Sequence, residues 1–402
     1  MRETGKETEM KDTTMKNTTR STISRRELVT AAYIVPFAAV RGSAQNSAVT
    51  VGLIGCGGRG THDGMTLAKN VPGARLVALA DLFPEKIEAA KKAAGVPDAK
   101  AYGRDTELLA KSGVDAVIIA TPVFLHPEHL EAAVRAGKHI YIEKPAGADV
   151  AGCLRLMRAA DSADRKLDIT FGFQQRYGAG YRKAKKLAES NGIGRIVMGH
   201  SYWVKNQVGS ERPTGATPPT TEREIMEQWH EWRQYFGDYI VENNVHGVDI
   251  LNWFLGGHPT KAVGSGGRTL ITVGDNTDHC YVTFDYANNV QGHLIGCMIT
   301  PRWYRDVKEM FFGTTGVIET HREFWRHYRS RTDILEEKEP VVNGVVRDIT
   351  IDSLTEFIQR IQEHRPENTA QTAVESTLTC IMGRMAQYGR KEVTWDEMLK
   401  SA

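Results

Sequence analysis

Hydrophobic and polar positions follow two different patterns along the chain. In the first of them, short apolar runs alternate with segments that are compatible with amphipathic helices. Such runs, about four to eight residues long, are typical of strands buried on both faces. The repeated strand–helix units predict a doubly wound parallel α/β sheet. The predicted strands are Val49–Ile54, Arg75–Ala80, Val114–Ala120 and Lys138–Ile142, with a helix from about His126 to Ala136.

The second pattern begins at about residue 165, where the alternation stops and β-prone runs follow one another. These runs are Leu167–Phe173, Arg195–Val204, His279–Tyr286 and Gln291–Thr300. They predict an α+β domain with a large open sheet of mixed or antiparallel strands. The predicted domains are therefore residues 45–165 and residues 166–402. A bare sheet face can pack against another subunit, so we expect a homo-oligomer, either a dimer or a tetramer.

One helix in the second domain combines apolar and ionisable positions. It is predicted from Val241 to Leu255 and ends at Gly256. Its apolar stripe consists of Val241, Val245, Val248, Leu251 and Leu255. Glu242, His246, Asp249 and Trp253 run alongside that stripe, about 100° around the axis. Ionisable groups on an apolar helix need partners, and Glu242 and His246, spaced four apart, could satisfy each other.

Composition narrows the classes of partner. The 402 residues suit two domains with sizeable cores. The chain has 51 Lys and Arg against 49 Asp and Glu, and most of the basic excess lies in residues 1–44. The near-neutral remainder has no basic field for nucleic acid or an anionic membrane, so neutral small-molecule substrates fit better. Five sparse Cys indicate no disulfide framework, although a Cys280–Cys297 pair stays open. His126 and His129 lack further ligands, so no metal site is expected.

The first 44 residues resemble a twin-arginine export signal. A polar segment precedes Arg25-Arg26, an apolar stretch from Leu28 to Val40 and the small residues Gly42-Ser43-Ala44. The apolar stretch is too short to span a bilayer, so we expect no permanent anchor and a periplasmic location. The alternative is a tail on a cytosolic protein.

A glycine turn follows the first predicted strand. The spacing Gly55-x-Gly57-x-x-Gly60, with Gly58 and Arg59 inside it, leads into a helix. This arrangement gives a tight turn, close approach of the backbone to a pyrophosphate, and amide N–H groups that face its charge. Asp81 lies 21 residues beyond Gly60, after the second strand, where a carboxylate can bind the ribose hydroxyls. A 2′-phosphate would be repelled there, so NAD is favoured over NADP.

Two further motifs follow later strands: Thr121-Pro122, with His126 after it, and Glu143-Lys144-Pro145. Together with the glycine turn, Gly194 before a β-prone run and the segment Val241–Gly256, they resemble the Gfo/Idh/MocA oxidoreductase family. The likeness covers nearly everything after about residue 48. It implies an NAD(P)-dependent enzyme that acts on sugars, cyclitols or related polyols, and it assigns Thr121, Pro122, His126, Glu143 and Lys144 to the cofactor crevice.

Three residues are candidates for the chemistry. Lys144 follows a buried strand and is expected over the crevice, as a hydrogen-bonding or proton-accepting amine. The resemblance implies that His246 and an acidic residue four positions before it, here Glu242, face the nicotinamide and the substrate. The family more usually has Asp at that position. Hydride transfer to NAD would then accompany removal of the hydroxyl proton by His246 or Lys144, while Glu143 orients its neighbours.

Weaker signals suggest substrate contacts. Arg176 follows a strand and could hold hydroxyl groups or form a surface ion pair. Trp203, Trp229 and Trp232 could stack on a sugar ring or belong to a core or subunit interface. Asp249 shares the helix side of His246 and is grouped with the substrate residues. The proline-containing segment 205–228 could be a lid, an arm or a surface loop.

Export constrains the function further. Without an NAD pool outside the cytoplasm, the cofactor must be held tightly and regenerated within each cycle. The main hypothesis is oxidation of CH–OH groups in sugars or glycosides. An NAD-dependent glycosidase, which oxidises, eliminates, hydrates and reduces one molecule, is an alternative. The other alternative is a non-catalytic sensor of NAD or sugar.

Overall fold

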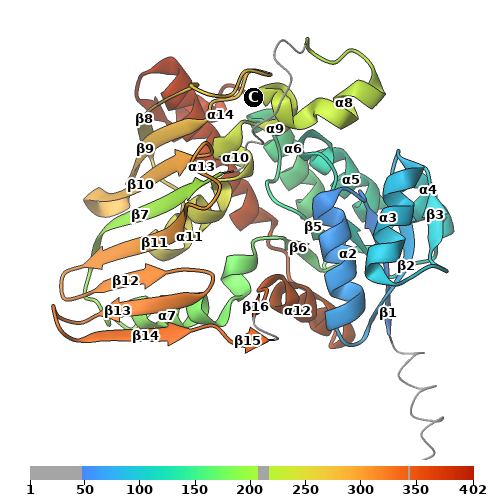
Figure 1. Cartoon of the computed structure of the whole chain (residues 1–402), viewed down its shortest axis with the longest axis horizontal. Coiled ribbons are helices and arrows are strands. Elements are labelled where there is room, and N and C mark those ends of the chain that lie inside the picture. Colours follow the sequence, from blue (N-terminus) through green and yellow to red (C-terminus); the bar gives the residue numbers. More distant parts are fainter. Residues whose placement is uncertain (1–47, 207–216, 343–344) are drawn as a thin grey trace, which may run out of the picture. The chain divides into compact units, whose positions relative to one another are not determined.

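The computed structural model describes residues 48–206, 217–342 and 345–402. The export signal predicted for residues 1–44 lies outside these ranges. Two large sheets organise the described residues (Figure 1), one of β1–β6 and the other of β7–β14 with β17. None of the described helices is long and apolar enough to cross a membrane. All five Cys are free, so Cys280 and Cys297 do not pair.

The first sheet has six parallel strands in the order β3-β2-β1-β4-β5-β6 among the described residues. Its strands are β1 Val49–Ile54, β2 Ala74–Ala80, β3 Lys100–Tyr102, β4 Ala116–Ile119, β5 His139–Ile142 and β6 Ile169–Phe171. Its helices are α2 Gly58–Asn70, α3 Pro84–Ala94, α4 Asp105–Lys111, α5 His126–Arg135 and α6 Val150–Asp161. The strand order reverses at β1, as in doubly wound nucleotide-binding sheets, which confirms the predicted fold class.

Later parts of the chain also belong to this layer. The predicted boundary after residue 165 falls before β6, which pairs in parallel with β5. Helix α12, Thr350–Gln362, packs its Leu354 and Phe357 in the same apolar cluster as Leu53 of β1 and Leu67 of α2. The first layer therefore takes a helix from near the C-terminus, which periodicity along the sequence could not indicate.

The second sheet has nine strands in the described residues, in the order β14-β13-β12-β11-β7-β10-β9-β8-β17. All neighbours are antiparallel except β7 and β10, so the predicted mixed sheet is confirmed. The strands are β7 Ile196–Lys205, β8 Lys261–Gly267, β9 His279–Tyr286, β10 Val290–Cys297, β11 Arg305–Gly313, β12 Val317–Thr320, β13 Phe324–Tyr328, β14 Ile334–Lys338 and β17 Val393–Thr394, and a separate ribbon pairs β15 Val341–Val342 with β16 Val345–Val346.

The helices of this part are α7 Ala179–Glu189, α8 Glu222–Gln228, α9 Arg233–Phe236, α10 Tyr239–Glu242, α11 Val245–Leu255, α13 Ala370–Gly389 and α14 Trp395–Leu399. The single helix predicted from Val241 to Leu255 is wrong, because the chain forms α10 and α11 with a break at Asn243 and Asn244. Asn is a poor helix former, and both side chains are buried here. Helix α11 ends as predicted, at Gly256 with a left-handed φ of 88°.

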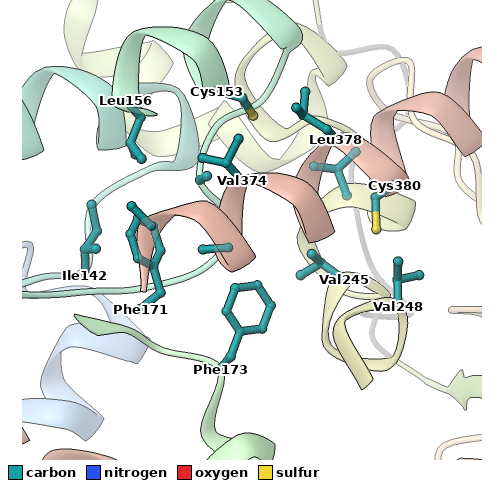
Figure 2. Close-up of a cluster of buried hydrophobic side chains, with 14 of the residues drawn as sticks. Ile142, Cys153, Leu156, Phe171, Phe173, Val245, Val248, Val374, Leu378 and Cys380 are labelled. Atoms are coloured by element: carbon teal, nitrogen blue, oxygen red, sulfur yellow. The ribbon is translucent and has the colours of Figure 1, made fainter. Parts of the chain in front are cut away.

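One apolar cluster joins the two sheets. Figure 2 shows Val374 and Leu378 of α13 among side chains from both layers. On one side lie Phe171 of β6 and Leu156 of α6, and on the other lies Val245 of α11. These side chains are at most 5% exposed, so the cluster forms a closed core. The two sheets are therefore packed on shared helices rather than linked only by the chain.

We expect Phe171→Ala to lower the free energy of unfolding by about 3–5 kcal/mol, because it leaves a cavity in this shared core. Urea unfolding followed by tryptophan fluorescence measures the change. Both sheets should unfold in one transition that moves to lower urea. The control Val345→Ala, at a position 69% exposed on β16, should change the stability by less than about 0.5 kcal/mol. Two separate transitions, with one unchanged by Phe171→Ala, would contradict a shared core.

Candidate functional site

A cavity of about 830 Å³ lies at the carboxyl ends of the first sheet's strands. Residues that follow β1, β2, β4 and β5 form one wall, and residues from β7, α8, α10 and α11 form the other. Ligands of doubly wound sheets collect at this edge, where the strand order reverses. The volume lies within the range of small-molecule and cofactor sites.

The glycine turn lines this cavity. Gly55 has a left-handed φ of 93°, and a Cβ on Gly60 would lie 1.8 Å from the Gly55 carbonyl oxygen. Only glycine fits these two positions. A Cβ on Gly57 or Gly58 would meet no atom within 4 Å, so the backbone there is open to a ligand. Helix α2 begins at this point without a side-chain cap or an acidic residue in its first turn, which suits a bound pyrophosphate. The turn therefore fits a dinucleotide.

Asp81 follows β2 and lines the same cavity. Its Oδ2 accepts a hydrogen bond of 2.7 Å from the Cys56 backbone N–H, and its Oδ1 accepts one of 2.9 Å from that of Phe83. The carboxylate thus fixes the glycine turn while facing the cavity. Burial, together with Asp81, raises the pKa of the Cys56 thiol to about 12, so this cysteine is an unreactive neighbour.

The residues after β4 and β5 lie together in the cavity wall as predicted, but both ring nitrogens of His126 contact backbone carbonyl oxygens of the protein. Thr121, Pro122 and His126 all line the cavity. The His126 ring contacts the Pro145 carbonyl oxygen at 2.7 Å through Nδ1 and that of Thr121 at 2.9 Å through Nε2. Burial lowers its pKa to about 4. His126 therefore ties the loop after β4 to the loop after β5.

Arg59 and Glu143 form a pair at the cavity wall. The Arg59 guanidinium donates to Glu143 Oε1 at 2.8 Å and also contacts Asp63 at 3.1 Å. Glu143 is 3% exposed. Because Arg59 belongs to the glycine turn, this contact links Glu143 to the turn, as expected of a carboxylate that orients its neighbours.

Lys144 bonds to Glu242 across the cavity. The Lys144 ammonium donates to Glu242 Oε1 at 2.5 Å and to the Glu242 carbonyl oxygen at 2.7 Å. The proposed pairing of Glu242 with His246 is therefore wrong. The break after α10 separates these two residues, and the lysine at the end of β5 supplies the stronger, charged partner. Lys144 enters the site as a paired ammonium group.

His246 lies beside this ion pair and is 6% exposed. Its ring stacks on Trp203, with centroids 5.2 Å apart and planes 13° apart, and its Nδ1 has no hydrogen-bond partner in the described residues. Burial lowers the pKa of His246 well below its usual value, and Lys144 and Arg322 lower it further. The ring is therefore a neutral imidazole, the form that accepts a proton.

Arg176 and Asp249 are not among the residues that line the cavity. Instead, Arg176 Nε and Nη2 donate to the two Asp249 carboxylate oxygens, each at 2.8 Å. Ser376 of α13 donates to the same carboxylate at 2.8 Å. Because Asp249 is only 1% exposed, its charge needs this bidentate partner. The structure thus puts both residues in a buried ion pair, away from the predicted substrate position.

Only two of the three tryptophans predicted to contact the substrate line the cavity. Trp203 and Trp229 line the cavity, whereas Trp232 does not. Within the segment 205–228, residues 207–216 lie outside the described ranges. Residues 222–228 form α8, which begins with a capping box between Thr221 and Glu224. Glu222 of α8 accepts hydrogen bonds of 2.5 and 2.9 Å from Arg104, so α8 is linked to the first domain at the cavity wall.

Four cations in the cavity were not predicted from the sequence: Lys86, Arg104, Lys205 and Arg322. Lys205 lies two residues beyond Trp203 on β7, so the strand period puts both on one face, and this signal was available. Arg322 lies in the turn between β12 and β13 and reaches the site only through the sheet topology. The described residues contain no cluster of three His, Cys, Asp or Glu that could hold a metal ion.

Comparisons with known proteins agree with this geometry. Inositol 2-dehydrogenase 3 of Saccharopolyspora erythraea is 32% identical over 207 residues, which are 52% of this chain and 54% of the relative. Inositol 2-dehydrogenase of Burkholderia ambifaria is 30% identical over 212 residues, or 53% and 56%. The chain therefore spans about half the length of these curated relatives.

Solved structures share the fold. Levoglucosan dehydrogenase in complex with NADH and levoglucosan has a TM-score of 0.74 at 18% identity, and the likeness covers 86% of this chain and 99% of that one. The apo scyllo-inositol dehydrogenase of Lactobacillus casei has a TM-score of 0.69 at 19% identity, with 87% and 99% covered.

The family comparison covers both sheets. Residues 49–171 match the oxidoreductase family with an NAD-binding Rossmann fold, and residues 181–319 match the GFO/IDH/MocA C-terminal domain. These two segments take in the glycine turn, Lys144, Glu242 and His246, and together they exceed half of the chain. The resemblance seen in the sequence is thereby confirmed, and the chain belongs to the Gfo/Idh/MocA oxidoreductase family.

Proposed function

We propose that the protein is an NAD-dependent oxidoreductase that oxidises a CH–OH group of a sugar, glycoside or related polyol. The observation that carries this proposal is the meeting of two sets of residues in one cavity. The glycine turn and Asp81 line it together with Lys144, Glu242 and His246. The similarity to inositol and levoglucosan dehydrogenases supports polyhydroxylated substrates.

The residues divide the work of oxidation. NAD, when bound, supplies the carbon that accepts the hydride. Neutral His246 is the candidate to accept the hydroxyl proton, because its ring lines the cavity. The Lys144 ammonium, held by Glu242, can donate a hydrogen bond to the substrate oxygen as negative charge develops there. Trp203 fixes the plane of the His246 ring by stacking.

We further propose export, with NAD held tightly and regenerated within each catalytic cycle. The twin-arginine-like sequence supports export, and the link between Arg104 and Glu222 supports a cavity that α8 helps to close over the cofactor. Regeneration requires a second substrate that takes the hydride back, or its return to the same molecule. The second route leads to the NAD-dependent glycosidase alternative, and cleavage of a glycoside without added NAD would identify it. A sensor would form no NADH with any sugar.

Substitution of the two proton-transfer residues tests the proposed oxidation. We expect Lys144→Met and His246→Asn each to lower turnover by about 10²–10⁴-fold, because each removes a group from the reacting oxygen. Turnover is measured as NADH fluorescence in a screen of sugars and polyols. The exposed-residue controls Lys166→Met and His364→Asn should keep full turnover. Unchanged turnover in both site variants would remove these residues from the mechanism.

Asp81 should determine the choice of NAD over NADP. Denaturing the purified protein should release NAD rather than NADP, because the Asp81 carboxylate repels a 2′-phosphate. In protein stripped of nucleotide, Asp81→Asn should reduce the preference for NADH over NADPH by about tenfold or more, as measured by fluorescence titration. The exposed Asp98→Asn is the matched control. Release of NADP, or an unchanged preference in Asp81→Asn, would contradict this assignment.

An exposed face of the second sheet is the candidate surface for association of subunits. On the second sheet, Tyr281 and Val263 are 50% and 45% exposed on neighbouring strands, and we propose that this face joins subunits of a dimer or tetramer. Light scattering should give a mass of two or four chains, and Tyr281→Glu should reduce it. Val341→Glu, at a 62% exposed residue outside this sheet, should leave the mass unchanged. A monomeric wild-type protein would end the proposal.

A further inference from the structure

Two cations on the second-sheet side of the cavity have no carboxylate partner among the described residues. Lys205 and Arg322 both line the cavity, yet neither forms an ion pair there. The one hydrogen bond from Arg322 within the described residues is a long contact of 3.4 Å to Gln175 Oε1, and its Nε is buried without a partner. At its buried Nε, this partly exposed guanidinium has lost water without gaining a counter-charge, which is costly unless a ligand supplies one.

The other charges near the reacting end are paired within the protein. Lys144 bonds to Glu242, and Arg59 bonds to Glu143. Glu309 lies near Arg322, but burial raises its pKa to about 8 and thus favours its uncharged form. Lys205 and Arg322 are therefore the cations at this end of the cavity that no carboxylate of the described residues pairs with.

Both cations lie next to the candidate base. The Lys205 Nζ is 5.0 Å from the centroid of the Trp203 ring, and the Arg322 Cζ is 5.7 Å from it. The same ring stacks on His246. Burial, Arg305 and Arg322 lower the pKa of Lys205 to about 8, as expected for an ammonium among like charges. Lys205, Arg322 and His246 thus all contact the same ring, that of Trp203.

These cations do not belong to the part of the chain that forms the pyrophosphate site. The glycine turn and the start of α2 belong to the first sheet, whereas Lys205 and Arg322 come from β7 and from the turn after β12 in the second sheet. The second sheet supplies the side of the cavity where a substrate would lie against His246.

We infer that the substrate is a carbohydrate with an anionic substituent, a carboxylate or a phosphate, held by Arg322 and Lys205 while the reacting CH–OH group lies at His246. This inference rests on the proposed oxidoreductase function and names its substrate class. It replaces the neutral substrate expected from the balanced charge of the whole chain. Arg supplies a planar fork that suits either anion.

Binding assays on the NAD-loaded Lys144→Met variant test this without turnover. D-glucuronate, D-galacturonate and D-glucose 6-phosphate are compared with D-glucose and D-galactose by titration calorimetry. We expect at least one anionic sugar to bind about 10- to 100-fold more tightly than its neutral counterpart. A preference for the uronates identifies the carboxylate as the recognised group, and a preference for the 6-phosphate identifies the phosphate. Equal or tighter binding of the neutral sugars overturns the inference.

Charge-removing variants sharpen the test. Adding Arg322→Met or Lys205→Met should abolish the preference for the anionic sugar and leave the affinity for the neutral sugar unchanged. Arg331→Met is the matched control, because Arg331 is an exposed residue between β13 and β14 and is not among the residues that line the cavity. NADH affinity and the thermal midpoint check that each variant folds. A preference unchanged in both Arg322→Met and Lys205→Met overturns the inference.

Failure of the proposed function looks different. If the wild-type protein binds no NADH and forms none with any sugar, the oxidoreductase proposal fails. If it forms NADH with neutral sugars and ignores the anionic ones, the oxidoreductase proposal stands and only the substrate class is wrong.

Discussion

The shared core of α13 is the constraint on which the cavity depends. Helix α13 buries Val374 and Leu378 between side chains of the first sheet and side chains of α11. Because close-packed cores resist deformation, this contact fixes α11 relative to β5. Lys144 at the end of β5 can then meet Glu242, just before α11, in a 2.5 Å contact. Preorganised groups of this kind are what a catalytic site requires.

The first domain could be predicted closely because its signals are local. The glycine spacing, the buried strand runs and Asp81 each depend on a few adjacent residues, and each element formed where expected. The Gly55 and Gly60 positions leave no room for a Cβ, so the pattern itself reports a geometric requirement. Sequence could also place Lys144 at the crevice, since strand ends of a parallel sheet meet at one edge.

The second domain was less predictable because its site depends on contacts between distant residues. Spacing along one helix suggested that Glu242 pairs with His246, but the break at Asn243 and Asn244 and the approach of Lys144 decided otherwise. Asp249 likewise took its partner from Arg176, 73 positions away in the sequence. Arg322 enters the cavity through antiparallel pairing of β11 with β7 and β12, which no local pattern specifies.

Net charge does not report the charges of the cavity, for a related reason. The chain is close to neutral because its charges cancel over the whole molecule, whereas a substrate responds to the few charges that line the cavity. There Lys144 and Arg59 are paired, while Lys205 and Arg322 remain uncompensated in the described residues. A balanced sequence, and a cavity lined by six Lys and Arg against seven Asp and Glu, are therefore compatible with two unpaired cations close to His246.

The same cations connect substrate binding to the chemistry. After burial, Lys144, Arg322, Arg59 and Lys205 each lower the pKa of His246, which keeps the ring neutral but also weakens it as a base. An anionic group between Arg322 and Lys205 would offset part of this field and raise the pKa of His246 toward its usual value. The imidazolium formed as the hydroxyl proton transfers would then be stabilised mainly when the charged substrate is in place. Binding energy from a remote anionic group would thereby be used at the reacting carbon, as differential binding of a transition state requires.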